Sequence, residues 1–222
     1  MALSGSIDLS YTARQFIEHS LYLINTRSLG NSTSAEQAEA ARTVLNLMLK
    51  SWQKYPGIWR RKEGFTSLVA ATASYSLSPR PYRVFAVRYR NTSSLDRRLN
   101  ELTKDEYYEL PDKASAGVPT SWFFDPQQST SSLYVWPVQA TITTETFRVS
   151  YQRVLDDIDD LANDVDITQE HFDTVAYNLA ARLADPAGKS SPHIERIIAR
   201  AQHLEQEMID ADRPEIVRFV PE

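Results

Sequence analysis

The chain has 222 residues, of which 42% are hydrophobic and 24% are charged, so it is large enough to fold around one core, or around one core and a smaller lobe. It contains no cysteine, which excludes disulfides, thiolate metal sites and cysteine nucleophiles. The formal net charge is −5, and no apolar run approaches the roughly 18 residues that a membrane helix needs. These properties predict a folded protein without a membrane span.

The charges are spread unevenly along the chain. Residues 54–104 hold eleven Lys/Arg against three Asp/Glu, whereas residues 105–222 hold nine Lys/Arg against twenty-two Asp/Glu. Segments of opposite charge can attract other copies of the chain or a polyanion, or they can neutralise each other inside one fold.

Apolar residues at helical spacing predict four long helices. Ser34 and Gln37 fit a capping box at the start of the second helix, and Pro192 fits the first position of the fourth. The predicted helices cover approximately residues 11–25, 35–54, 169–184 and 192–211.

Between the second and third helices the apolar period changes to two, which indicates strands. Phe147, Val149 and Tyr151 alternate with polar residues, so one face of the last strand should be buried. A short helix is expected near residues 104–110, where Thr103 and Glu106 form a possible capping box. The predicted strands are residues 65–70, 74–77, 82–90, 121–124, 133–136 and 144–151.

This order of elements predicts an α+β fold. In the predicted architecture, N- and C-terminal helices form one antiparallel helical bundle, a β-rich region is inserted between helices 2 and 3, and an extended C-terminal tail follows. The corresponding boundaries are residues 1–58, 59–152, 153–212 and 213–222.

Catalytic motifs are weak in this sequence. The four histidines, His19, His171, His193 and His203, have no metal-ligand spacing, and the six glycines form no phosphate loop, dinucleotide fingerprint or nucleophile elbow. We therefore expect no enzyme activity, no cofactor and no metal. A site assembled from scattered residues would escape such a search.

The run at residues 155–166 holds six aspartates in twelve residues. Such a run can chelate a hard cation, but it lacks the glycine and glutamate of an EF-hand loop. The simpler interpretation is a solvated acidic loop before the N-terminus of the third helix, where negative charge is favoured. Four of its residues are candidates for an acidic contact surface: Asp156, Asp157, Asp159 and Asp160.

The basic segment interleaves arginines with Trp59, Tyr82 and Tyr89, a mixture that can bind nucleic acid. The acidic whole chain and the absence of a DNA-reading motif argue against sequence-specific DNA binding. We expect this patch to contact a neighbouring acidic subunit or, loosely, passing DNA. Its candidate residues are Arg60, Arg61, Lys62, Arg83, Arg88, Arg90, Arg97 and Arg98.

Several short patterns occur in an order that resembles the head-to-tail adaptor, or packaged-DNA stabilisation, proteins of short-tailed bacteriophages. Residues 45–52 read Leu-Asn-Leu-Met-Leu-Lys-Ser-Trp, and residues 75–77 read Tyr-Ser-Leu. Residues 117–122 read Gly-Val-Pro-Thr-Ser-Trp, and residues 133–137 read Leu-Tyr-Val-Trp-Pro. After Tyr151 and the aspartate run, residues 176–184 read Ala-Tyr-Asn-Leu-Ala-Ala-Arg-Leu-Ala. The resemblance covers roughly residues 8–210, and it lies in the order of packing patterns rather than in any single motif.

The resemblance implies a structural virion protein at the head-tail junction. Such proteins bind the portal protein after DNA packaging, form a ring that is usually dodecameric, retain the genome and offer a platform to the next tail protein. Host cytoplasm would be the site of assembly. The alternatives are a tail terminator or tail-tube component and, from another class, a cell-wall hydrolase acting at infection.

The last ten residues contain a β-prone segment between two prolines, with no evident partner in its own chain. Extended segments of this kind bind by adding to a sheet or groove of a neighbour. We expect it to dock on the portal through Arg213, Ile216, Val217, Arg218, Phe219 and Val220.

Overall fold

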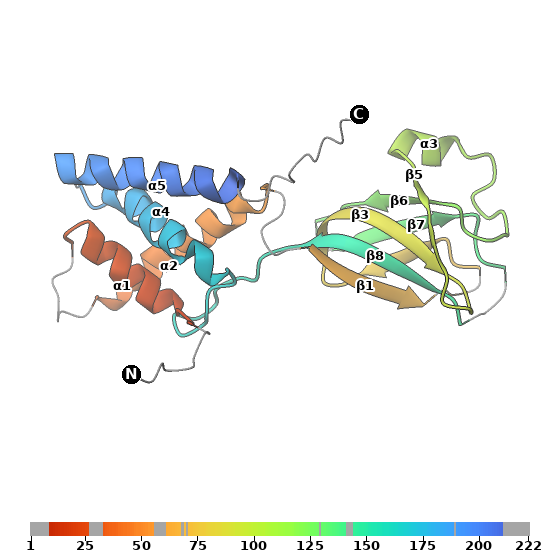
Figure 1. Ribbon diagram of the computed structural model, residues 1–222, viewed down its shortest axis with the longest axis horizontal. Coiled ribbons are helices and arrows are strands. Elements are labelled where there is room, and N and C mark those ends of the chain that lie inside the picture. Colours follow the sequence, from red (N-terminus) through yellow and green to blue (C-terminus); the bar gives the residue numbers. More distant parts are fainter. Residues whose placement is uncertain are drawn as a thin grey trace, which may run out of the picture. The chain divides into compact units, whose positions relative to one another are not determined.

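The structure is a computed structural model that describes residues 9–26, 33–55, 61–67, 69, 71–128, 130–140, 144–188 and 190–210. It divides into two compact units (Figure 1). Residues 1–59 and 155–222 belong to a helical unit, and residues 60–154 form a strand unit.

The helical unit is built from helices whose starts are specified by local capping. Thr12 precedes α1, where its side chain accepts a hydrogen bond from Gln15 N and its own N–H donates to Gln15 Oε1. Ser34 caps α2 by accepting from Gln37 N at 3.2 Å. The elements are α1 (Ala13–Leu23), α2 (Ala35–Trp52), a 3-10 helix (Gln169–His171), α4 (Phe172–Ala184) and α5 (Pro192–Asp210).

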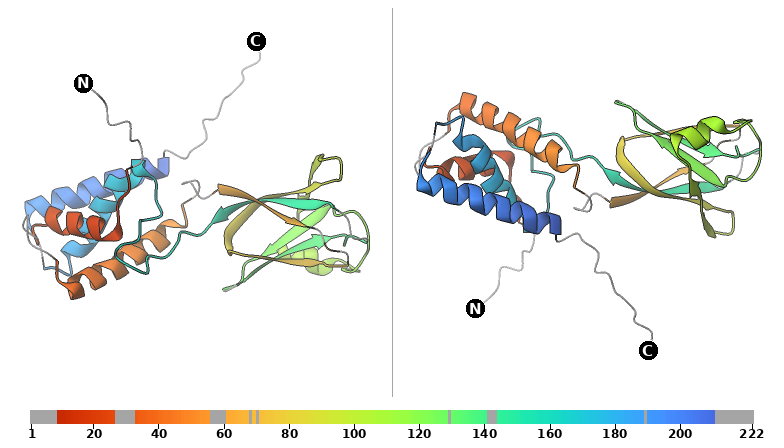
Figure 2. Two further views of the ribbon diagram at one scale, coloured as in Figure 1. Left: turned by 90° about the horizontal axis from the view of Figure 1, so that it is seen from below. Right: turned by 90° about the horizontal axis from the view of Figure 1, so that it is seen from above.

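Helix α4 is the centre of the helical unit. It packs mainly against α1 and α5 and less extensively against α2 (Figure 2). Ser20 Oγ on α1 lies 3.0 Å from the carbonyl oxygen of Ala176, and Asn178 Nδ2 donates to the carbonyl of Ala201 on α5 at 3.1 Å. Both polar side chains are buried, so these hydrogen bonds also satisfy groups that would otherwise be costly to bury.

The predicted antiparallel bundle of N- and C-terminal helices is wrong. Helices α1, α2 and α5 are grouped around α4 instead of sharing one bundle axis, and strands dominate the middle of the chain as a unit with its own core. The physical reason lies in α4. Its buried residues include Thr174, Val175 and Ala176 in succession, so more than one stripe of this helix is covered.

The strand unit consists of two four-stranded sheets, with strand orders β1-β8-β3-β4 and β2-β7-β6-β5 (Figure 1). One buried cluster combines residues of both sheets, among them Val87, Phe147, Trp122 and Leu133. The two sheets therefore enclose a shared core. The strands are β1 (Arg61–Ser67), β2 (Ser74–Leu77), β3 (Pro81–Arg90), β4 (Asp96–Arg98), β5 (Asn100–Glu101), β6 (Ser121–Asp125), β7 (Ser131–Trp136) and β8 (Thr146–Arg153).

The register of the first sheet decides which side chains face the core. Val87 lies opposite Val149 and Tyr89 opposite Phe147, and all four are buried. Because side chains alternate along a strand, the residues between them face outward. Arg88 and its partner on β8, Arg148, therefore share the outer face of this sheet.

Two short strands and one helix complete the strand unit. The chain leaves the first sheet after β4, buries Leu99, and enters the second sheet at β5. All residues of β4 and β5 are exposed, so no alternation of apolar residues marked them in the sequence. Helix α3 (Lys104–Glu109) covers the outer side of the second sheet, where Tyr107 stacks on Phe123.

Candidate functional site

The aspartate-rich run forms a strap along the helical unit, here called the acidic strap (residues 155–165). Its apolar side chains are buried: Leu155, Ile158 and Val165 are each at most 6% exposed and belong to the core of the helical unit. Its aspartates at positions 156, 157, 159, 160 and 164 are exposed. The run therefore alternates between anchoring apolar residues and solvated carboxylates.

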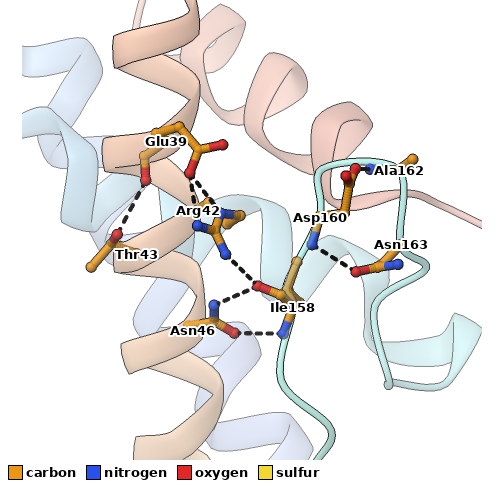
Figure 3. Close-up of polar contacts among 8 residues, drawn as sticks. All are labelled: Glu39, Arg42, Thr43, Asn46, Ile158, Asp160, Ala162 and Asn163. Atoms are coloured by element: carbon orange, nitrogen blue, oxygen red, sulfur yellow. Dashed lines mark hydrogen bonds and ion pairs between the residues drawn. The ribbon is translucent and has the colours of Figure 1, made fainter.

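Three side chains of α2 hold the main chain of the strap, and Figure 3 shows two of them, Arg42 and Asn46, at Ile158. Arg42 Nη1 and Asn46 Nδ2 both donate to the carbonyl oxygen of Ile158, at 2.7 and 3.0 Å, and Asn46 Oδ1 accepts from Ile158 N at 3.0 Å. Lys50 Nζ donates to the carbonyl of Leu155 at 2.6 Å. These contacts satisfy backbone groups that lie outside any regular element.

The other half of the strap closes the N-terminal end of α1. The first two amides of that helix, on Ala13 and Arg14, donate to the carbonyls of Asn163 and Leu161 at 2.9 and 3.0 Å. The first amides of a helix have no partner within the helix, so another part of the chain or water must satisfy them. The strap supplies these acceptors and links α1 to α2 at the same time.

The aspartates of the strap have different local roles. Asp157 forms an ion pair with Lys50 at 2.7 Å, and Asp160 Oδ1 accepts from Ala162 N at 2.8 Å within the turn (Figure 3). Within the described part of the chain, the carboxylates of Asp159 and Asp164 make no hydrogen bond or ion pair and are directed to solvent. The strap thus presents negative charge from a main chain that is held in place.

Among residues 9–210 as far as they are described, no group of three or more His, Asp or Glu side chains is placed to hold a metal ion. The acidic strap is therefore best described as an anchored, charged surface.

A second charged surface lies on the outer face of the β1-β8-β3-β4 sheet, here called the arginine face. Arg98 of β4 lies directly opposite Arg88 of β3, which lies directly opposite Arg148 of β8. Three guanidinium groups thus form one row across three neighbouring strands. Arg90 lies two residues from Arg88 on β3. Arg83 lies five residues from Arg88, but an irregularity between Val84 and Ala86 restores its face, so that it pairs with Gln152, four residues from Arg148 on β8.

Two carboxylates balance part of this charge. Arg90 binds Asp96 through two hydrogen bonds of 2.6 and 2.7 Å, and Arg88 Nη1 lies 3.0 Å from Glu63 Oε1. The hydrogen bonds from Arg90, with the charges of Arg148 and Arg88, lower the pKa of Asp96. Among the described residues of this face, the five arginines outnumber the two carboxylates that pair with Arg90 and Arg88, so positive charge is in excess.

The structure separates Arg97 from the other basic residues predicted on β3 and β4. Arg97 lies opposite Tyr89, packs over its ring and donates to the carbonyl of Pro119 at 2.6 Å. Lys62 is exposed on β1 and lies opposite Tyr151, a residue that packs on the core. Arg61 begins β1, but its side chain lies outside the described residues, as does the whole of Arg60.

Arg148 belongs to the arginine face although the sequence analysis assigned it no role. It stands in the acidic part of the chain, far in sequence from its neighbours Arg88 and Arg98. The alternation of Phe147 and Val149 with polar residues already placed Arg148 on an outer face, but only the strand register identifies its neighbours.

The proposed portal-binding residues of the tail, at positions 213–220, lie outside the described residues. The histidines are dispersed: His193 Nε2 contacts the carbonyl oxygen of Leu23 at 2.8 Å, and His203 lies 3.4 Å from Glu207 on the same helix. His171 is half-buried, and burial lowers its pKa. None of these contacts brings two histidines together.

A groove of about 450 Å³ lies beside the N-terminal ends of α1 and α4. Its lining is mostly apolar, including Tyr11 and Phe172, and it also contains the carboxylates of Asp164 and Glu170. The backbone N–H of Glu170 lowers the pKa of its own carboxyl group. A carboxyl held in its ionised form is unsuited to act as a general acid.

No family model matches this chain, and no curated protein matches it either. None of the described helices combines the length and the apolar character that crossing a membrane requires.

Proposed function

We propose that this chain is a structural virion protein, a head-to-tail adaptor that binds the phage portal ring after DNA packaging and offers a platform for the tail. The observation that carries the proposal is the shared order of family-like packing patterns along the chain. Several residues of these patterns pack in a hydrophobic core, since Trp52, Tyr75, Trp122 and Leu179 are all buried. The proposal includes a ring of copies, a location at the head-tail junction and no catalytic role.

The charged surfaces support a binding role over a catalytic one. The aspartates of the acidic strap are exposed, and the arginine face combines exposed Arg83 and Arg98 with three half-buried arginines, which suits contacts with other macromolecules. The groove between α1 and α4, in contrast, contains Glu170 in a setting that favours its ionised form. Glycoside hydrolysis needs a carboxylic acid that remains protonated, so this groove offers little support for a cell-wall hydrolase.

The decisive experiment is sedimentation of the protein with the purified portal ring from the same genome. We expect one copy to bind per portal subunit, in a complex that survives gel filtration. If the protein does not bind the portal but binds isolated tails, it is instead a tail terminator or tail-tube component. Turnover of peptidoglycan would contradict the non-catalytic role.

The same experiment can test whether the C-terminal tail is the part of the chain that binds the portal. Deletion of residues 213–222 should abolish portal binding while leaving the unfolding transition of the helical unit unchanged. Two full-length variants separate the contributions: Ile216→Ser with Phe219→Ser removes apolar contacts, and Arg213→Gln with Arg218→Gln removes charge. Portal binding that survives the deletion would place the contact elsewhere on the protein.

A further inference from the structure

The row of arginines on the outer face of the first sheet is unfavourable for the isolated strand unit. Like charges directly opposite each other on neighbouring strands destabilise a sheet. Arg98, Arg88 and Arg148 are arranged in this way across three strands, and Glu63 contacts Arg88. Arg98 makes no hydrogen bond or ion pair within the described part of the chain. Such a local conflict is expected where a surface serves an interaction.

The opposite charge is concentrated in the other unit. The strand unit, residues 60–154, holds thirteen Lys/Arg against nine Asp/Glu, a net of +4, while the helical unit holds eleven against twenty, a net of −9. The acidic strap is the part of the helical unit where exposed carboxylates are most closely spaced in sequence. Because α2 and α1 hold its main chain by six hydrogen bonds, its carboxylates are presented without the entropy loss of ordering a free loop.

We propose that the arginine face of one copy binds the acidic strap of a second copy. Arginine suits this contact because its planar guanidinium group can donate two parallel hydrogen bonds to one carboxylate. The two surfaces belong to different units, so the contact is heterologous and can be repeated from copy to copy until a ring closes. The inference rests on the proposed function for the ring, and it names the surfaces by which neighbouring copies meet.

A second copy fits the arginine face better than DNA does. The chain as a whole carries a net charge of −5 and has a pI of about 5.5, so its long-range field repels a polyanion. Proteins that bind DNA through phosphates usually have a strongly basic binding domain. The acidic strap offers the complementary charge on every copy of the same chain.

The test uses two charge reversals and one control in the full-length protein. The face variant is Arg83→Glu with Arg98→Glu, and the strap variant is Asp159→Lys with Asp164→Lys. All four residues are exposed, so their replacement should leave both cores intact. The matched control reverses two exposed arginines of α5, Arg196→Glu with Arg200→Glu, which changes the net charge as much as the face variant does.

Self-association is measured by sedimentation velocity at low ionic strength over a concentration series. The wild-type protein and the α5 control should associate and should dissociate as salt is added, because salt screens exposed charges. Each charge reversal should weaken association by at least about tenfold, since it replaces attraction with repulsion. The mixture of the face and strap variants should associate again, as should the chain that carries all four substitutions.

A wild-type protein that remains monomeric at low salt overturns the inference, and so does an equal loss in the α5 control. Failure of the mixture to associate also overturns it. If the wild-type protein instead binds duplex DNA and the face variant does not, the arginine face is a DNA surface. Portal binding without self-association would refute only this contact, whereas self-association without portal binding would refute the adaptor function.

Discussion

In the helical unit, charged side chains of α2 hold a loop in place, whereas in the strand unit charged side chains form a row across the surface of a sheet. Lys50 and Arg42 donate to main-chain carbonyls of the acidic strap. Arg88 and Arg98 instead face each other on neighbouring strands. The difference shows that a charge run in the sequence can be a structural anchor in one unit and an exposed binding surface in the other.

The two units also differ in how their cores form. The helical core collects α1, α2, α4, α5 and buried residues of the strap around one central helix, whereas the strand core lies between two sheets. Each unit therefore contains a set of buried residues that it does not share with the other. We expect a substitution in the core of one unit to lower the stability of that unit and to leave the other unchanged.

The largest expected effect tests this independence. Trp122→Ala should cost the strand unit about 3–5 kcal/mol, because it leaves a large cavity at a site that is 2% exposed. Hydrogen exchange should then accelerate in β3, β6, β7 and β8, while the amides of α4 keep their protection. Trp52→Ala, at an equally buried site in the helical core, should show the reverse pattern. Equal loss of protection in both units after either substitution would contradict two separate cores.

An intermediate effect is expected from the clamp on the acidic strap. Asn46→Ala removes the donor and the acceptor that bind the backbone of Ile158, so it should cost about 1–3 kcal/mol. The amide of Ile158 should exchange faster while β8 remains unchanged. Thr43→Ala is the matched control, because Thr43 is exposed on the same helix and bonds only within it (Figure 3). A similar loss in both variants would mean that the effect comes from the helix and not from the strap.

The smallest effect concerns Asp96, whose pKa is lowered by the hydrogen bonds from Arg90. A carboxyl with a lowered pKa in the folded state stabilises the fold above its unfolded pKa of roughly 4, and this contribution is lost as the pH falls through the folded pKa. Asp96→Asn should therefore make the strand unit slightly less stable at neutral pH and less sensitive to acid. Denaturant unfolding at several pH values below neutrality measures this difference. An unchanged acid response in the variant would show that Arg90 and Asp96 are not coupled in solution.

Local features of the fold could be predicted because they depend on neighbouring residues. The capping box at Thr103 and Glu106 forms as expected, Ser34 caps α2 without the reciprocal bond to the Gln37 side chain, and the alternation around Phe147 indicates the buried face of β8. The arrangement of helices around α4 could not be predicted from one apolar stripe per helix. It depends on buried polar links such as Asn178 with Ala201, which join residues on different helices.

The sequence by itself determined where the helices and the longer strands form, because apolar period, caps and prolines act within a few residues, but it did not reveal β4 and β5. Only the tertiary structure decided what the charged residues do. Main-chain carbonyls of the acidic strap have no sequence signature, so the role of Asn46 appears only when the strap crosses α2. The row of Arg98, Arg88 and Arg148 depends on strand register, which long-range pairing sets.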